Sequence, residues 1–302
     1  MKRDFLTFWE LSKNEVESIL ERAACFKAGN TGNKSSLSGK SIGLFFEKSS
    51  TRTRVSFEVG IYQLGGQPVY IRSGDSQVGR GESISDTARV LSRYFDGLIV
   101  RTYAQVRLEE FAKYSTAPVI NGLSDTHHPC QVLADLLTIK ERKGKLQGIK
   151  LTYLGDSNNV TNSLIEASLR MGIVLSIASP AGFEPKPAMM KKLHDLDYQG
   201  IKIYNDPVEA VKQADVVYTD VWISMGDEET GQQKKKDALK PFQINDALLK
   251  HANPDVTVLH CLPAHRGEEI TDSVIDGPMS AVFDQAENRL HTQKALLEML
   301  IG

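Results

Sequence analysis

Residues 49–54, SSTRTR, place hydroxyl side chains and two arginines after an apolar run, where a helix is predicted to begin. Ser49, Ser50 or Thr51 is suited to cap this helix, because a hydroxyl oxygen accepts from the first free backbone N–H groups. The arginines oppose the helix dipole, at a cost of about 0.3–1 kcal/mol each. With a bound phosphate the arginines become favourable at this helix start, because N–H groups, hydroxyls and guanidinium groups all bind an oxyanion. The GxxxxGK[ST] spacing of a Walker A loop is absent.

A second group is HHPCQ, residues 127–131. Pro129 suits the first position of a helix, which puts His128 at the N-cap. A neutral imidazole N–H at that position can polarise a carbonyl group, and the amide of Gln131 can bind an amide on a ligand. The alternative for His128 is a histidine whose hydrogen bonds are satisfied in the core.

Cys261 follows a β-rich run in HCLP, and Asp220 lies near the end of another such run. With His260 and His265 the cysteine has the pattern H-C-x₃-H, but the paired ligands usual for zinc are absent, so we expect no metal. The thiol either is inert in the interior or contacts an amine. A buried Asp220 needs a cationic partner, either a structural lysine or a substrate.

The elements that position these residues form an alternating α/β pattern. Short apolar runs are separated by segments of helix length, which is typical of buried parallel strands in doubly wound sheets. We expect a first domain over 1–132 and a second over 148–285, joined by bridging helices, with the final helix 286–302 packed back on the first. The predicted strands are 41–47, 68–72, 97–102, 117–121, 150–155, 174–179, 201–205, 215–220 and 256–261.

Polar side chains follow six of these strands at the same end. Besides the groups above, Arg101 ends the strand 97–102, and GDSNN (155–159) follows the strand 150–155. Ligands of open α/β sheets bind outside the carboxyl ends of the strands. We therefore expect the six groups to share one site, in the crevice between the domains.

Two further stretches carry structural expectations. The helix after SSTRTR has a broad apolar face, so we expect it to be well buried; that face comprises Val55, Phe57, Val59, Ile61, Tyr62 and Leu64. The basic run Lys234–Lys236 follows the acidic stretch Asp227–Glu229, and we interpret it as a solvated loop.

Composition excludes several classes of function. The 302 residues carry a formal net charge of −2 and no basic stripe, which gives no support for nucleic-acid binding. No apolar stretch has the length of a membrane span, and the charged N-terminus does not resemble a signal peptide. Three scattered cysteines do not make a disulfide framework, so we expect a cytoplasmic protein.

Four ordered motifs resemble those of the aspartate/ornithine carbamoyltransferase family over nearly the whole chain. STRTR (50–54) is similar to its carbamoyl phosphate signature, and HPCQ (128–131) to its second motif. The stretch from Asp220 to SMG (224–226) and HCLP (260–263) are similar to the ornithine branch rather than the aspartate branch. The resemblance implies transfer of a carbamoyl group from carbamoyl phosphate to the δ-amine of L-ornithine, giving L-citrulline and phosphate in arginine metabolism.

The resemblance also implies a set of site residues and an assembly, a homotrimer or a multiple of trimers without cofactor or metal. Loop 73–82 would send Gln77 into a neighbouring subunit's site. Asp220 and Cys261 would orient the amine and ease its deprotonation. The carbamoyl phosphate ligands would be Ser50, Thr51, Arg52, Thr53, Gln77, Arg101, His128, Gln131, Cys261, Leu262 and Arg289, and the ornithine ligands Asn159, Asp220, Ser224 and Met225.

Rival interpretations remain at this point. Putrescine or an N-acylated ornithine could be the acceptor, although Asp220 fits a free amino acid better. A catalytically idle member that only binds carbamoyl phosphate is a rival from another class. A nicotinamide-dependent dehydrogenase is disfavoured, because the turn GDSNN lacks the GxGxxG glycines.

Overall fold

The computed structural model describes residues 2–30, 35–72, 74, 81–223 and 230–302. The chain forms two compact units. Unit 1 comprises Met1–Leu137 and Glu287–Gly302, and unit 2 comprises Thr138–Ala286. Each unit is built on one parallel sheet, so the predicted class of two parallel-sheet α/β domains is confirmed.

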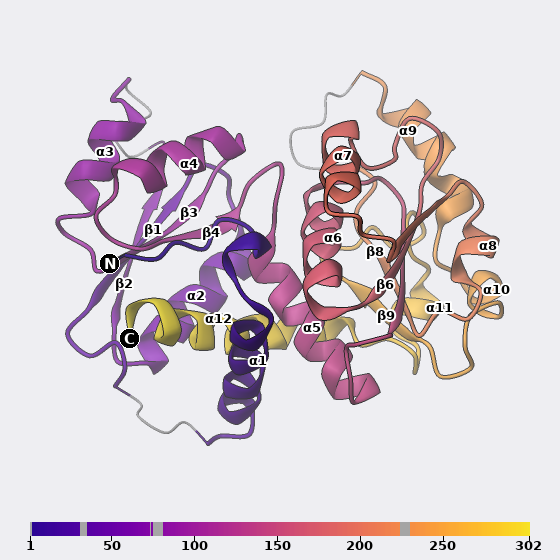
Figure 1. Cartoon of the computed structure of the whole chain (residues 1–302), viewed down its shortest axis with the longest axis horizontal. Coiled ribbons are helices and arrows are strands. Elements are labelled where there is room, and N and C mark those ends of the chain that lie inside the picture. The colour runs from indigo at the N-terminus through magenta and orange to yellow at the C-terminus, as the bar shows by residue number, and fades with distance from the viewer. Residues whose placement is uncertain (1, 31–34, 73, 75–80, 224–229) are drawn as a thin grey trace. The chain divides into compact units, whose positions relative to one another are not determined.

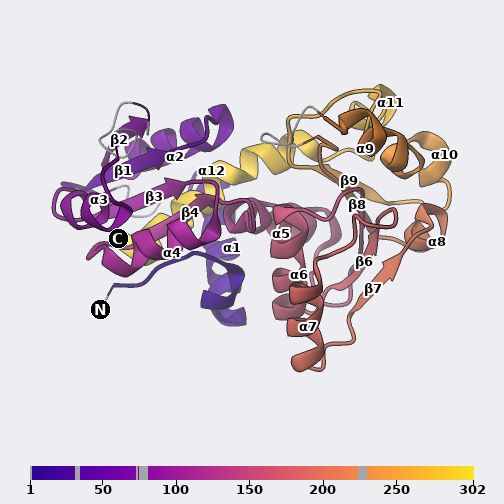
Figure 2. The ribbon, with the colours of Figure 1, turned by 90° about the horizontal axis from the view of Figure 1, so that it is seen from above.

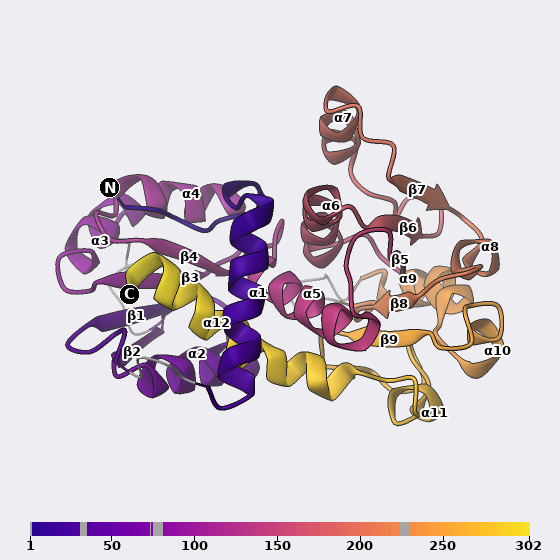
Figure 3. The same ribbon diagram turned by 60° about the horizontal axis from the view of Figure 1, so that its bottom comes forward.

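The sheet of unit 1 has the order β2-β1-β3-β4. Helices α3 (Ile84–Leu91) and α4 (Gln105–Tyr114) cover one face, and Phe45, Leu98 and Phe111 pack between the layers. The helices α1 (Lys13–Lys27), α2 (Thr51–Gln63) and α12 (Val282–Ile301) lie on the other face (Figure 1; Figure 3). The strands are β1 (Ser41–Phe46), β2 (Gln67–Arg72), β3 (Gly97–Arg101) and β4 (Val119–Leu123).

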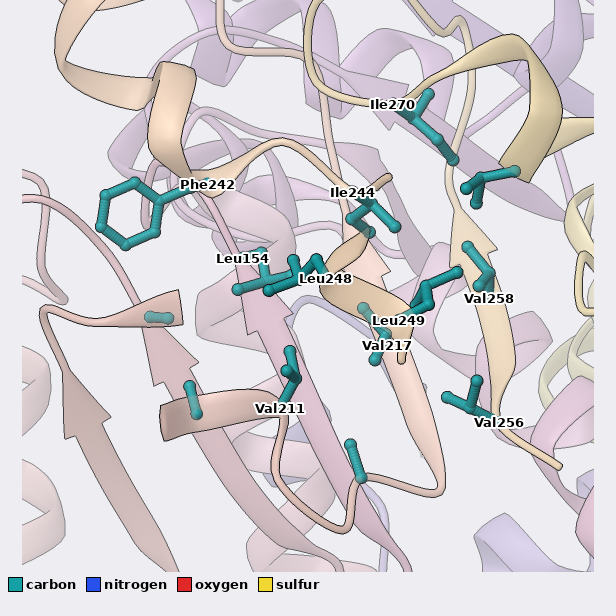
Figure 4. Packing of buried hydrophobic residues seen from close by; sticks show 14 of the residues in the cluster. Leu154, Val211, Val217, Phe242, Ile244, Leu248, Leu249, Val256, Val258 and Ile270 are labelled. Carbon is teal, nitrogen blue, oxygen red and sulfur yellow. The ribbon is translucent and has the colours of Figure 1, made fainter. Parts of the chain in front are cut away.

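The sheet of unit 2 has the order β7-β6-β5-β8-β9, with β7 and β9 at its edges (Figure 2). Figure 4 shows the core on one face of this sheet, where Leu154, Val217 and Val258 meet Leu248 and Leu249 of a short helix. The strands are β5 (Lys150–Leu154), β6 (Val174–Ala178), β7 (Ile201–Tyr204), β8 (Val216–Thr219) and β9 (Thr257–His260). The helices are α6 (Asn159–Met171), α7 (Pro187–Asp195), α8 (Pro207–Val211), α9 (Gln232–Leu239), α10 (Asp246–Leu249) and α11 (Asp272–Ile275), and α5 (Pro129–Lys143) runs from unit 1 into unit 2.

Both strand orders reverse direction at one point, between β1 and β3 in unit 1 and between β5 and β8 in unit 2. Doubly wound sheets bind ligands outside the carboxyl ends of the strands at such points. The residues after β1 and β3 are SSTRTR and the neighbourhood of Arg101, and those after β5 and β8 are GDSNN and Asp220. Each unit therefore presents polar groups where a ligand is expected.

Three sequence expectations need correction. Helix α2 is only half buried, because Phe57 and Ile61 face the core while Val55, Val59 and Tyr62 are exposed. The basic run Lys234–Lys236 lies in helix α9 and not in a loop. Strand β4 begins at Val119, two residues later than expected, since Pro118 before it has no N–H for a ladder. None of the described helices is long and apolar enough to cross a membrane.

Candidate active site

The turn from β1 into α2 has the geometry of an anion site. Ser50 is the N-cap, and its hydroxyl accepts from the N–H of Thr53 at 3.3 Å. Thr51 and Arg52 in the first turn are exposed, whereas Thr53 is buried. The free N–H groups and the hydroxyls at this helix start are donors to an oxyanion.

The two arginines of this turn have different surroundings. The Nε of Arg54 donates to Glu58 Oε1 at 2.9 Å, and its guanidinium lies 3.8 Å from the centroid of the Tyr70 ring. Arg52 forms no ion pair with any carboxylate in the part of the chain that the structure describes. Arg52 is therefore the arginine of this turn that is available to a bound anion, since Arg54 has a partner within its own helix.

Arg101, at the end of β3, is a buried cation in a positive field. Its side chain is 4% exposed, and its Nε has no hydrogen-bond partner among the described residues. Burial, followed by the positive charges of Arg289 and Arg52, lowers the pKa of Arg101 to about 10. Burial and the two neighbouring positive charges thus make the Arg101 cation unfavourable, and a bound anion would offset this cost.

His128 directly precedes α5, and its carbonyl accepts from the N–H of Gln131 at 3.1 Å. Burial, with the charges of Arg289 and Arg101, holds the pKa of His128 well below its usual value. The ring is therefore neutral at physiological pH, as a carbonyl-polarising N–H donor requires.

Arg289 of α12 connects two of the predicted ligands. It donates from Nη1 to Gln131 Oε1 at 2.6 Å and from Nη2 to Thr53 Oγ1 at 3.2 Å. The amide nitrogen of Gln131 donates to Asp135 at 2.8 Å. Unit 1 thus brings together eight of the predicted residues around the carboxyl ends of its strands: Ser50, Thr51, Arg52, Thr53, Arg101, His128, Gln131 and Arg289.

Lys48 and Glu47, which the sequence analysis missed, connect the loops of unit 1 through polar contacts. Lys48 pairs with Asp125 and lies 4.5 Å from the centroid of the Tyr103 ring. Glu47 accepts from the hydroxyl of Thr102 and from the guanidinium of Arg107. The loops after β1, β3 and β4 are therefore linked to one another, which fixes the residues beside SSTRTR.

In unit 2, Asp220 follows β8 and is 8% exposed. Its Oδ2 accepts from Asn158 Nδ2 at 2.7 Å, and its Oδ1 accepts from the N–H of Val221 at 2.8 Å. Over the described ranges, no lysine, arginine or histidine forms an ion pair with Asp220. A structural lysine was one of the two expected partners, so the remaining candidate is a cationic ligand.

Cys261 lies beside that carboxylate. Its Sγ donates to Asp220 Oδ1 at 2.8 Å. Leu262, the next residue, has a left-handed backbone (φ +56°), and its peptide bond to Pro263 is cis. The thiol is thus partly exposed and held against a carboxylate.

Two groups of side chains have ligand atoms within 4.8 Å of one another and could hold a metal ion: Asp220, His260 and Cys261, and His265, Glu268 and Glu269. In the first group both ring nitrogens of His260 already have partners, the N–H of Leu262 and Glu269 Oε1. To bind a metal ion, the His260 ring would have to give up one of these hydrogen bonds.

The remaining predicted residues are less well placed. Asn159 is the first residue of α6 and is partly buried. Gln77, Ser224 and Met225 lie outside the described residues. Sequence reasoning included Asn158 in the GDSNN group but assigned it no role, although an asparagine before a helix is a recognisable capping signal.

Two family models together match most of the chain. The family model "Aspartate/ornithine carbamoyltransferase, carbamoyl-P binding domain" matches residues 3–141. The model "Aspartate/ornithine carbamoyltransferase, Asp/Orn binding domain" matches residues 147–300.

Individual relatives match along almost their whole length. An ornithine carbamoyltransferase of Thermococcus kodakarensis is 51% identical over 99% of this chain and 96% of the relative. An ornithine carbamoyltransferase of Pyrococcus furiosus, described as anabolic, is 50% identical over 99% of this chain and 96% of its own length. The solved structure of an ornithine carbamoyltransferase from Pyrococcus furiosus superposes with a TM-score of 0.93 at 49% identity, covering 99% of this chain and 97% of that one.

Proposed function

The chain belongs to the aspartate/ornithine carbamoyltransferase family, and we propose that it transfers the carbamoyl group of carbamoyl phosphate to the δ-amine of L-ornithine. The products are L-citrulline and phosphate. The observation that carries this function is the group of arginines in unit 1, where burial, followed by the charges of Arg289 and Arg52, lowers the pKa of Arg101 to about 10. Relatives described as ornithine carbamoyltransferases support the same acceptor, and one described as anabolic supports a role in arginine biosynthesis.

Carbamoyl phosphate binds through its phosphate to the start of α2. The hydroxyls and N–H groups of Ser50, Thr51 and Thr53 donate to the phosphate oxygens, and Arg52 and Arg101 supply the positive charge. This assignment is supported by the exposed first turn and by Arg52, which has no carboxylate partner in the described parts of the chain.

The carbamoyl group is polarised by Arg101, Thr53 and His128. A neutral His128 donates an N–H to the carbonyl oxygen, and such donors are worth roughly 10²–10³ each in rate when they meet developing negative charge. The carbamoyl NH₂ group donates to Gln131 and to the backbone carbonyls of Cys261 and Leu262, with Arg289 nearby. Gln77, from the same or a neighbouring subunit, completes this set.

Ornithine binds through Asn159, Asp220, Ser224 and Met225. Asp220 keeps lone pairs free, because Oδ2 accepts only the amide of Asn158 among the described residues. The δ-amine is protonated in water, with a pKa near 10, as for lysine. Asp220 and Cys261 orient it and ease its deprotonation.

The neutral amine then attacks the carbonyl carbon. The ammonium group has by then released one proton to solvent. A C–N bond forms, the C–O bond to phosphate breaks, and the departing phosphate takes the second proton, which the attacking nitrogen loses. Holding the amine and the carbonyl carbon in contact supplies much of the rate.

The direct test is steady-state product formation by purified protein, with carbamoyl phosphate saturated first. Ornithine, putrescine and N-acetylornithine are compared side by side. We expect citrulline from ornithine and little product from the other two amines, because only ornithine presents a free α-amino acid beside its δ-amine. A product other than citrulline, or binding of carbamoyl phosphate without turnover, would overturn the proposal.

The assembly is a homotrimer or a multiple of trimers. The exposed stripe of α2 supports self-association, since Val55, Val59 and Tyr62 are 49%, 38% and 77% exposed and a second copy would bury them. Sedimentation of the wild type and of Tyr62→Glu tests this, and a monomeric wild type would contradict it. The thiols of Cys25, Cys130 and Cys261, which form no disulfide in the described parts of the chain, support a cytoplasmic location.

A further inference from the structure

Leu262 adopts a backbone conformation that an L-residue avoids. Its φ is +56°, one of three positive values at non-glycine residues in the described chain. The left-handed region is unfavourable for leucine because its Cβ approaches the neighbouring carbonyl. Such a conformation persists only where the surroundings impose it, and it occurs most often at functional sites.

The surroundings that impose it are two buried side chains. His260 Nδ1 accepts from the N–H of Leu262 at 2.9 Å, which closes a turn of two residues. A ring nitrogen that accepts an N–H carries no proton, so the proton of the neutral ring is on Nε2. Nε2 lies 3.1 Å from Glu269 Oε1 and donates to it.

Glu269 is itself fixed. It is 0% exposed, and its Oε1 also accepts from the N–H of His265 at 2.5 Å. His260 is 1% exposed, and its own N–H donates to Gln285 Oε1 at 2.9 Å. The carboxylate therefore fixes both the tautomer and the orientation of the ring, as second partners of histidine do in other sites.

The conformation of Leu262 affects the candidate active site because Leu262 is bonded to Cys261. Leu262 follows Cys261, whose thiol donates to Asp220 Oδ1 at 2.8 Å. A change in the Leu262 backbone turns the two carbonyls proposed to accept from the carbamoyl NH₂ group, and it moves the thiol relative to the carboxylate.

We propose that His260 and Glu269 are positioning residues for carbamoyl transfer. They hold Leu262 in the left-handed conformation and thereby keep the Cys261 thiol against Asp220. The inference rests on the proposed function, because it assigns both residues a role in that reaction.

A matched pair of amide variants separates the two hydrogen bonds of His260. In His260→Asn, the side-chain oxygen occupies the place of Nδ1 and can still accept from the N–H of Leu262, as in an Asx turn. In His260→Gln, the longer amide reaches toward Glu269 but offers no acceptor at the Nδ1 position. We expect His260→Asn to keep kcat within about threefold, and His260→Gln to lose roughly 10- to 100-fold in kcat.

Binding of carbamoyl phosphate provides a second readout. Its phosphate contacts come from unit 1, so we expect its Kd to change less than about threefold in both variants. Exposed His251 supplies the control, and His251→Gln should match the wild type in every measurement. Equal losses of kcat in the two His260 variants, or no loss in either, would overturn the inference.

The ring tautomer can be measured without any variant. We expect ¹⁵N chemical shifts of the wild-type protein to show the proton of His260 on Nε2. A proton on Nδ1 would overturn the inference, whatever the variants do. If the wild type forms no citrulline but His260 has the Nε2 tautomer, the proposed function is contradicted. The hydrogen bond to His260 that holds the Leu262 backbone would still be supported.

Discussion

Asn158 donates from Nδ2 to Asp220 Oδ2 at 2.7 Å, while its own Oδ1 accepts from the N–H groups of Val160 and Thr161 at 2.9 and 3.3 Å. One amide thus caps α6 and orients the carboxylate after β8. Because an amide and not a cation holds Asp220, its negative charge remains available for a substrate ammonium group.

Replacing Asn158 by alanine should affect both stability and ornithine binding. Loss of the cap lowers the free energy of unfolding by about 1 kcal/mol, and the freed Asp220 raises KM for ornithine. Asn158→Asp is the matched variant, because it keeps the cap but places a second carboxylate beside Asp220. Urea unfolding and ornithine kinetics check both, and an unchanged KM for ornithine in Asn158→Ala would contradict this role.

Cys261→Ala removes the donor that contacts Asp220. A hydrogen bond to a charged group contributes about 1.5–3 kcal/mol, so we expect kcat/KM for ornithine to fall roughly 10- to 150-fold. The pH profile of kcat should also shift, since the thiol helps to set the charge beside the amine. Cys25→Ala, at an exposed thiol on α1, is the control. Unchanged kcat and KM for ornithine would remove Cys261 from the mechanism.

Replacing Arg101 should stabilise the ligand-free protein and weaken its binding of carbamoyl phosphate. Its charge is buried, and its pKa is lowered to about 10 by burial and by Arg289 and Arg52. We therefore expect Arg101→Met to raise the Tm of the ligand-free protein while carbamoyl phosphate binding weakens at least roughly tenfold. A calorimetric scan with and without carbamoyl phosphate measures both. A lower Tm with unchanged affinity would show that Arg101 is a structural residue.

His128 should make stability depend on pH. Its pKa in the folded protein is held well below its usual value of 6.5 by burial and by Arg289 and Arg101. The unfolded chain therefore takes up a proton below about pH 6.5 that the folded protein refuses, so stability falls as pH falls there, by up to about 1.4 kcal/mol per pH unit. Above pH 6.5 this contribution is complete.

Urea unfolding between pH 5 and pH 7.5 tests this dependence in wild type and His128→Gln. The variant should lose the part of the slope that His128 causes. Equal slopes in the two proteins would show that His128 is not the titrating group.

Much of the fold followed from local pattern. The apolar runs are strands, and most of them are buried, but the edge strands β2 and β7 are partly exposed. The polar groups after the strands lie at the carboxyl ends of two parallel sheets, because parallel pairing places those ends at one edge. The predictions of burial were wrong where tertiary packing decides which residues face the core. Periodicity gave α2 one broad apolar face, but it could not tell that Phe57 faces the core while Val55 and Tyr62 do not.

Some residues of the candidate site could be predicted from the sequence, and others could not. Residue types and motifs pointed to Arg52, Asp220 and Cys261, whereas partners that are remote in sequence could not be read locally. Glu269 lies nine residues from His260 in an unremarkable GEE segment, and its role depends on a buried hydrogen bond. The second function of Asn158 likewise requires β8 to end beside α6.

We propose above that the start of α2 binds a phosphoryl donor through Arg52. Calorimetric titration with a stable phosphonate analogue of carbamoyl phosphate tests it in the wild type, Arg52→Gln and Arg54→Gln. Arg54 is already paired with Glu58, so we expect its variant to change Kd less than about threefold, while Arg52→Gln weakens binding roughly 10- to 150-fold. Unchanged affinity in Arg52→Gln, or equal losses in the two variants, would contradict the claim.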